Sequence, residues 1–288
     1  MARTQTMPNR MRVISTNEEM SQACREAVKP IGLVPTMGAL HAGHLSLVDR
    51  ARADNLTVAV SIFVNPAQFG DKADLEKYPR DLEGDLELLR SHGVDLVYSP
   101  TVAEVYPEGF DTWINVGPLA DKLEGAHRPG HFRGVATVVA KLFNVTSPNR
   151  AYFGQKDGQQ TVVIQKLVKD LDMDVEVVVM PTIRESDGLA MSSRNIQLSP
   201  EQRQAATVVY QALCRAHRLW MDGERNGDAL RAAAQVILKT ESQVDEIDYV
   251  SVADMATLGE LNQVEGRAMI SAALHMGAVR LIDNIVLE

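Results

Sequence analysis

Two histidines stand three residues apart in a glycine-bearing turn, and their spacing points to phosphate chemistry. The segment Ile31–His44 carries an apolar run, then Gly38, His41 and Gly43, and then the start of a helix-length stretch. A strand, a glycine turn and a helix start in this order present free backbone N–H groups and a positive helix end to an anion. His41 and His44 would lie on one side of such a helix start, where both rings donate hydrogen bonds to phosphate oxygens.

The same two histidines have other interpretations. An HxxH pair supplies half of a zinc site, but zinc needs further ligands, and the sequence shows no Cys/His cluster near the pair. Single histidines also serve as plain surface or core residues. We favour nucleotide phosphate because the glycines and the strand-to-helix setting match it. Preorganised donors at the α-phosphorus also lower the barrier to adenylyl transfer. The metal and structural interpretations stay open.

A second polar segment, Ala151–Gln160, follows an apolar strand end. Lys156 is placed to neutralise triphosphate charge, Asp157 to accept from ribose hydroxyls, and Gln160 to bond a small polar substrate. Open α/β sheets bind their ligands at the carboxyl ends of strands, which supports this assignment. A solvated helix start with Asp157 as its N-cap is the alternative.

A third segment, Met191–Asn195, combines the hydroxyls of Ser192 and Ser193 with the guanidinium of Arg194. These groups suit phosphate oxygens. Alone, the segment fits a Ser-rich linker better, but ATP needs contacts at both ends of its triphosphate and the histidine turn supplies only one. We therefore predict that this segment and the histidine turn bind the same nucleotide.

A fourth segment, Phe63–Gly70, closes an apolar strand with the amide side chains of Asn65 and Gln68. Neutral donors of this kind suit a small hydroxy acid, which offers hydroxyl groups and a single carboxylate. An ordinary Asn-Pro turn is the alternative interpretation.

Apolar patterning indicates the elements that must position these side chains. Up to about residue 180, short apolar runs alternate with amphipathic segments of helical length, a pattern typical of a parallel α/β sheet. We predict a doubly wound, Rossmann-like domain over residues 11–183. Its expected strands are Arg12–Ser15, Ile31–Pro35, Leu56–Val64, Asp95–Tyr98, Thr112–Val116 and Val175–Met180, and its helices include Asn17–Val28, His44–Ala53, Asp81–Ser91, Val135–Asn144 and Gln160–Leu171.

The pattern changes after Pro181, which predicts a smaller α+β domain over residues 184–288. Ser199 and Pro200 suit the N-cap and first position of a helix. We expect helices near 199–222 and 227–239, followed by the three strands Asp245–Val252, Arg267–Leu274 and Val279–Val286, which suit an antiparallel sheet.

The composition narrows the class of protein. The chain has 288 residues, with 45% hydrophobic and 23% charged, as in ordinary globular enzymes. A net charge of -9 argues against broad nucleic-acid binding. No stretch approaches the roughly 20 apolar residues of a membrane span, and the polar N-terminus lacks a secretory signal, so we expect a cytoplasmic protein that does not bind membranes. Cys24 and Cys214 are too few and too far apart for a disulfide framework.

The motifs together resemble the pantothenate synthetase (pantoate–β-alanine ligase) family, and the likeness spans nearly the whole chain. HxGH alone would indicate only a nucleotidylyl-transferase superfamily, whereas this set matches in order. The segments that carry the resemblance are Pro35–His44, Phe63–Gly70, Tyr78–Arg80, Arg128–Phe132, Phe153–Gln160 and Met191–Asn195.

The resemblance implies a ligase that uses ATP and Mg²⁺ to form enzyme-bound pantoyl adenylate, which β-alanine then attacks to give pantothenate. It implies a homodimer, and it does not identify the magnesium ligands. It also implies catalytic roles for His44, His41 and Lys156, and places Gln68, Gln160 and Asn65 at pantoate, with Gln68 also at β-alanine. The ATP contacts it implies are Met37, Gly38, Ala39, Leu40, His41, Ala42, Gly43, His44, Gly154, Gln155, Lys156, Asp157, Ile183, Met191, Ser192, Ser193 and Arg194.

The chain departs from the family pattern at two positions. Gln155 stands where Glu is usual and Gly158 where a bulkier residue is usual, so we expect a more flexible helix start there. Residues 1–10 precede the family-like start and are predicted to be disordered. Two other functions stay open. The chain could be another HxGH nucleotidylyl transferase, although an acceptor phosphate would favour more Arg or Lys beside the glutamines, or a non-catalytic nucleotide-binding module.

Overall fold

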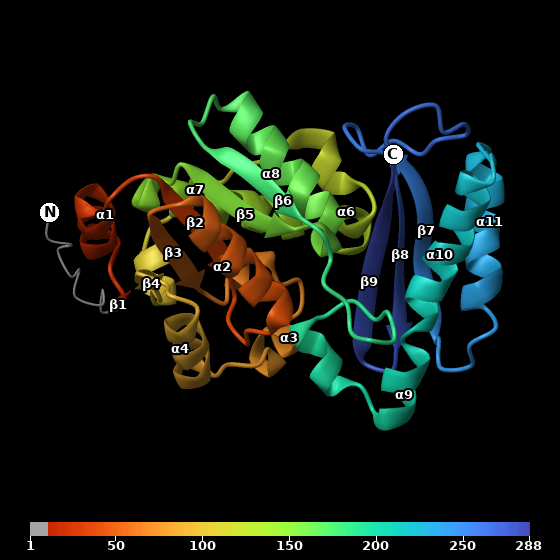
Figure 1. Cartoon of the computed structure of the whole chain (residues 1–288), viewed down its shortest axis with the longest axis horizontal. Helices are drawn as coiled ribbons and strands as arrows, with labels where there is room; N and C mark the ends of the chain where they lie inside the picture. Colours follow the sequence, from red (N-terminus) through yellow and green to blue (C-terminus); the bar gives the residue numbers. More distant parts are fainter. Residues whose placement is uncertain (1–10) are drawn as a thin grey trace, which may run out of the picture.

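A six-stranded, fully parallel sheet forms the centre of the larger part of the molecule (Figure 1). The computed structural model of the protein describes residues 11–288, so the extension predicted over residues 1–10 lies outside it. The strand order is β1-β4-β3-β2-β5-β6. The strands are β1 (Arg12–Ile14), β2 (Ile31–Thr36), β3 (Thr57–Ile62), β4 (Leu96–Tyr98), β5 (Arg150–Gly154) and β6 (Glu176–Met180). The chain winds outward in both directions from β2 and β5, which confirms the doubly wound fold.

Alternating side chains of the central strands supply the two faces of this sheet. In β3, Ala59 packs into one core cluster, while Val58 and Val60 pack into the other. In β5, Phe153 and Tyr152 divide in the same way, as the two-residue period of a strand requires. Helices α1 (Asn17–Glu26), α7 (His131–Thr146) and α8 (Gly158–Asp170) cover the first face, and α2 (Ala42–Asp54) and α4 (Leu82–Ser91) cover the second.

The second part of the molecule is a three-stranded antiparallel sheet with helices packed on one face. Its core cluster joins the sheet to two helices. The other face turns toward the parallel sheet, where Met269 enters the core cluster of the larger part. The elements are α9 (Pro200–Ala205), α10 (Val208–Met221), α11 (Gly227–Leu238), β7 (Glu246–Asp254), β8 (Ala268–Met276) and β9 (Val279–Leu287).

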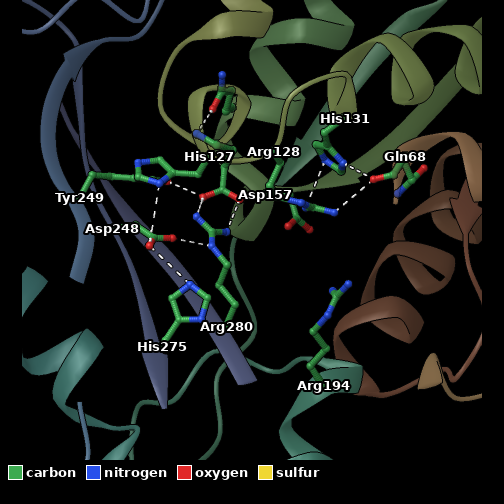
Figure 2. A network of polar contacts seen from close by, with 12 residues as sticks. Gln68, His127, Arg128, His131, Asp157, Arg194, Asp248, Tyr249, His275 and Arg280 are labelled. Atoms are coloured by element: carbon green, nitrogen blue, oxygen red, sulfur yellow. Dashed lines mark hydrogen bonds and ion pairs between the residues drawn. The ribbon is translucent and has the colours of Figure 1, made fainter. Parts of the chain in front are cut away.

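An ion-pair network joins the two parts. Arg280 of β9 donates to both carboxylate oxygens of Glu124, in α6 (Glu124–His127), at 2.6 and 2.8 Å. Its Nε donates to Asp248 of β7 at 2.6 Å, and the hydroxyl of Tyr249 donates to Glu124 at 2.8 Å (Figure 2). The side chains of Glu124 and Asp248 are only 8% and 7% exposed, so losing Arg280 would remove the guanidinium that both carboxylates share.

Three expectations about the elements were wrong. Thr112–Val116 is not a strand; its apolar residues alternate because Val116 and Ile114 pack against the core of the larger part, and the Ile114 N–H donates to a side chain of α7. The strand Arg150–Gly154 was absent from the predicted set, although its end was recognised as a strand end. The predicted helix 199–222 is two helices, α9 and α10. The apolar face continues across the break, so the apolar pattern did not reveal it. Ser199 does cap α9, confirming that helix start.

Candidate active site

The histidine turn joins the end of β2 to the start of α2, and the two rings cap that helix. Nδ1 of His41 accepts from the backbone N–H of Gly43 at 3.1 Å. Nδ1 of His44 accepts from the backbone N–H of His41 at 3.4 Å, and the ring centroids are 4.1 Å apart. A Cβ at Gly43 would lie 2.9 Å from the ring of His41, which explains the glycine between them.

These hydrogen bonds determine where each histidine carries its proton. A neutral imidazole has one N–H, so an Nδ1 that accepts leaves the proton on Nε2. Burial lowers the pKa of His44 to about 3, and burial followed by the charge of Lys156 lowers the pKa of His41 to about 4. Both rings are therefore neutral at pH 7. Each presents an Nε2–H donor to the cavity that it lines.

A third histidine, His131 at the start of α7, is buried in the same cavity wall. Its Nδ1 lies 2.8 Å from the backbone oxygen of Gln68 and therefore donates to it. Its Nε2 then accepts from Arg128, 3.4 Å away. Burial lowers the pKa of His131 to about 4, so this ring is neutral as well.

The low pKa values of these histidines predict acid-sensitive stability. Unfolded histidines titrate near 6.5, whereas in the folded protein His131 titrates near 4. The unfolded chain therefore binds more protons between these pH values. The contribution of the neutral histidine to the free energy of unfolding is fully present above about pH 6.5 and is lost as the pH decreases through this window. Each such histidine adds a slope of about 1.4 kcal/mol per pH unit. Denaturant titrations from pH 7 to pH 4 measure it.

A matched variant tests the origin of this slope. His131→Asn keeps an amide donor near the Nδ1 position but has nothing to titrate. We expect its free energy of unfolding to depend less steeply on pH than that of the unmodified chain, by the slope that corresponds to about one bound proton. An unchanged slope in the variant would show that His131 does not contribute.

Two further backbone amides of the turn are already hydrogen-bonded. Asp85 of α4 accepts from the N–H groups of Ala39 and Leu40 at 2.9 and 2.7 Å. These amides are therefore not free phosphate donors in this structure, and burial raises the pKa of Asp85. Of the predicted ATP contacts, the structure does not bring Gly38, Ala39, Leu40, Ala42 or Gln155 to the cavity wall.

The other predicted residues do meet around one cavity of about 220 Å³. It opens at the carboxyl ends of β2, β3 and β5, beside the point where the winding direction of the sheet reverses. Ligands of open α/β sheets bind at this position. The predicted residues on its wall are Met37, His41, Gly43, His44, Asn65, Gln68, Gly154, Lys156, Asp157, Gln160, Ile183, Met191, Ser192, Ser193 and Arg194.

Asn65 and Gln68 form an amide corner of this cavity. Asn65 is buried, and its Nδ2 donates to Oε1 of Gln68 at 2.9 Å, while its Oδ1 accepts from the hydroxyl of Tyr106 at 2.8 Å. The amide of Gln68 therefore has a defined orientation, with Nε2 turned toward the sulfur of Met37 at 3.3 Å. Asn65 acts on the cavity through Gln68.

Charged side chains of both signs line a second cavity of about 330 Å³, which shares wall residues with the first. Lys156 lies 3.4 Å from Asp157, and Arg194 lies 3.1 Å from Asp74. Burial alone would raise the pKa of Asp157, but Lys156 and Arg194 more than offset it and the pKa is lowered. Asp157 occupies the N-cap position of α8, as the alternative interpretation required, but its side chain makes no capping hydrogen bond.

The motif Arg128–Phe132 did not predict which groups surround the side chain of Arg128. Its Nη2 donates to the backbone oxygen of Gln68 at 3.2 Å, and its guanidinium faces the same space as those of Arg194 and Arg280 (Figure 2). Among the residues that the structure describes, no carboxylate lies within 4.0 Å of it. Burial lowers the pKa of Arg128. Its position on the wall of both cavities makes it a candidate anion site.

Within residues 11–288, no group of three or more His, Cys, Asp or Glu side chains is placed to hold a metal ion. Within the same range, no helix has the length and apolar character needed to cross a membrane.

The fold and the site define a phosphate-binding α/β enzyme of the HxGH type. The sequence model of the family described as Pantoate-beta-alanine ligase matches residues 11–286. The pantothenate synthetases of Roseiflexus castenholzii and Chloroflexus aggregans are 57% and 56% identical to this chain, covering 96% of it and 100% of their own length. The chain belongs to the pantoate–β-alanine ligase family.

Solved structures agree with this assignment. The pantothenate synthetase of Thermus thermophilus superposes with a TM-score of 0.91 at 47% identity, covering 96% of this chain and 99% of that one. The pantoate-beta-alanine ligase of Francisella tularensis, solved in complex with beta-gamma ATP and beta-alanine, gives a TM-score of 0.77 at 35% identity, covering 96% and 97%.

Proposed function

We propose that the chain condenses pantoate with β-alanine at the expense of ATP, through a pantoyl adenylate. A pantoate carboxylate oxygen attacks the α-phosphorus, the bond from that phosphorus to the bridging oxygen breaks, and pyrophosphate leaves. The β-alanine nitrogen then attacks the acyl carbon, AMP leaves, and the amine releases a proton. The observation that carries the proposal is the pair of neutral Nε2–H donors, His41 and His44, facing a cavity that Gln68 and Lys156 also line.

The histidines act as hydrogen-bond donors rather than as acids. Because His41 and His44 are uncharged at pH 7, they stabilise the charge that develops on the α-phosphate oxygens without transferring a proton. The ammonium group of Lys156 neutralises part of the negative charge of the same phosphates. The further ATP contacts proposed are Met37, Gly43, Gly154, Asp157, Ile183 and Met191–Arg194, all on the cavity wall. Gly38, Ala39, Leu40 and Ala42 shape the loop, and Gln155 lies away from the cavity.

Gln68 and Gln160 hold pantoate in this proposal, and Asn65 keeps Gln68 in place. The apolar part of the wall includes Val139 and Leu142 of α7, which suits the carbon skeleton of a small branched acid. The amides bond its hydroxyl groups and carboxylate without adding positive charge, so the carboxylate remains nucleophilic.

Four further features belong to the proposal. Mg²⁺ accompanies ATP and takes most of its ligands from phosphate oxygens and water. A homodimer rests on the family resemblance alone, and a cytoplasmic location rests on the sequence expectations given above. The boundary near Ile183 is supported by the core cluster of the smaller part, whose members within the described range all lie at Leu189 or beyond.

One assay tests the proposed function. Pantoate-dependent exchange of labelled pyrophosphate into ATP, with β-alanine omitted, is expected to be rapid because adenylate formation is reversible. It should require pantoate and should proceed without release of pantothenate. Absence of exchange at saturating Mg²⁺ would exclude the adenylate mechanism. Exchange that occurs with a phosphorylated acceptor but not with pantoate would instead identify another nucleotidylyl transferase.

A further inference from the structure

Asn284 of β9 reaches from the smaller part of the molecule to the turn that carries Lys156. Its Nδ2 donates to the backbone oxygens of Gln155 and Lys156, at 2.8 and 3.0 Å. Its Oδ1 accepts from Nε2 of Gln155 at 2.9 Å. Asn284 is buried, and its side-chain amide uses both its donor and its acceptor groups on this one turn.

This geometry requires an amide at position 284. A carboxylate offers no donor for the two carbonyl groups, and a hydroxyl offers only one hydrogen. The turn Gln155–Asp157 is a single 3-10 turn between β5 and α8, and it makes no side-chain cap of its own. Asn284 therefore supplies the side-chain hydrogen bonds that hold the backbone of Lys156.

Gln155 and Gly158, the two positions that the resemblance marks as unusual, both face this amide. Gln155 is its hydrogen-bond partner, and a Cβ at Gly158 would lie 2.5 Å from the sulfur of Met269 and 3.0 Å from Nδ2 of Asn284. A larger residue at position 158 would push β8 and β9 away from the turn. Gln155 and Gly158 therefore fit the close approach of the smaller part, rather than loosening the helix start.

We propose that Asn284 is a positioning residue for adenylate formation, acting through Lys156, with Gln155 and Gly158 as its matched partners. Asn284 fixes the carbonyl groups of the two peptide bonds that flank the Cα of Lys156, and so the direction in which the Lys156 side chain leaves the backbone. The ammonium group therefore extends toward the phosphates from a fixed Cα–Cβ direction. This inference rests on the proposed function.

The test uses the exchange assay without β-alanine. Asn284→Ala is expected to lower kcat at least tenfold at saturating ATP, with the KM for pantoate changed less than threefold. The matched control is Ser271→Ala. Ser271 pairs with Asn284 across β8 and β9, and its buried Oγ has no hydrogen-bond partner among the described residues, so kcat should stay within twofold.

A double-mutant cycle separates positioning from mere docking of the smaller part. If Asn284 acts through Lys156, adding Asn284→Ala to Lys156→Ala should change kcat less than twofold. Effects that multiply would overturn the proposal. Should Asn284→Ala fail to fold, as judged by circular dichroism, Gln155→Ala removes one of the three bonds and should lower kcat about threefold to fivefold; unchanged kcat in that variant would overturn the proposal too. No exchange by the unmodified chain would instead refute the proposed function.

Discussion

His44→Ala is expected to lower kcat for pyrophosphate exchange by about 10² to 10³, while the KM for ATP changes less than about threefold. The reason is geometric. Nδ1 of His44 is held by the backbone N–H of His41, so Nε2–H points into the cavity as a preorganised neutral donor. A donor aimed at charge that develops only in the transition state contributes to turnover and little to ground-state binding.

Two amide variants locate the active nitrogen of His44. Glutamine places its Nε2 near the imidazole Nε2 and can still donate, whereas asparagine reaches only the Nδ1 position. His44→Gln should therefore retain at least tenfold more activity than His44→Asn. A loss below about tenfold for His44→Ala, roughly 1.4 kcal/mol, would contradict a transition-state role. Equal activity of the two amide variants would contradict the assignment to Nε2.

Arg128→Gln is expected to lower kcat/KM for β-alanine by about 10², because it removes a partly buried charge that has no carboxylate within 4.0 Å in the described chain. Pantoate loses its charge when it becomes an acyl adenylate, but β-alanine keeps a carboxylate throughout the reaction. One cation is therefore needed for that group. Lys156, Arg194 and Arg280 already face carboxylates, whereas Arg128 lies against Gln68 without one.

The amide of β-alanine is the probe that isolates this charge. It keeps the nucleophilic amine and has no carboxylate, so the Arg128→Gln variant should use it about as well as the unmodified enzyme does. The preference for β-alanine over its amide should fall about 10²-fold, and Arg128→Lys should keep part of it. Pyrophosphate exchange should stay within threefold. If exchange falls as far as β-alanine use, Arg128 serves ATP or pyrophosphate instead.

Local patterns in the sequence were enough to predict most of the fold. The alternation of apolar runs and helical segments identified the parallel sheet, and the Ser199 cap was visible from a few residues. The pattern failed at Thr112–Val116, where alternate residues are buried against α7 although the segment pairs with no strand of the described chain. Alternate burial occurs both in a strand and in an irregular segment of this kind, so the apolar pattern cannot separate the two.

The candidate site also combines features that neighbouring residues predict with features that depend on distant residues. A strand, a glycine and a helix start adjoin one another in the chain, so the residues of the histidine turn were enough to predict a phosphate site without any tertiary contact. The structure added residues that lie far away in sequence. Asp85 occupies turn amides from 45 residues away, and Asn284 holds the Lys156 turn from 128 residues away.

Charge balance was also decided by the tertiary structure. The sequence shows that Arg128 stands in a glycine-containing motif, but not that every carboxylate of residues 11–288 lies more than 4.0 Å from it. By itself the sequence determined the fold class, the strand-glycine-helix turn with its two histidines and the family, because these depend on neighbouring residues. Only the tertiary structure decided which cation has no carboxylate nearby among the described residues, which amides remain free and which side chain positions Lys156. Ion pairs and hydrogen bonds depend on distances between segments, and the order of residues in the chain does not contain those distances.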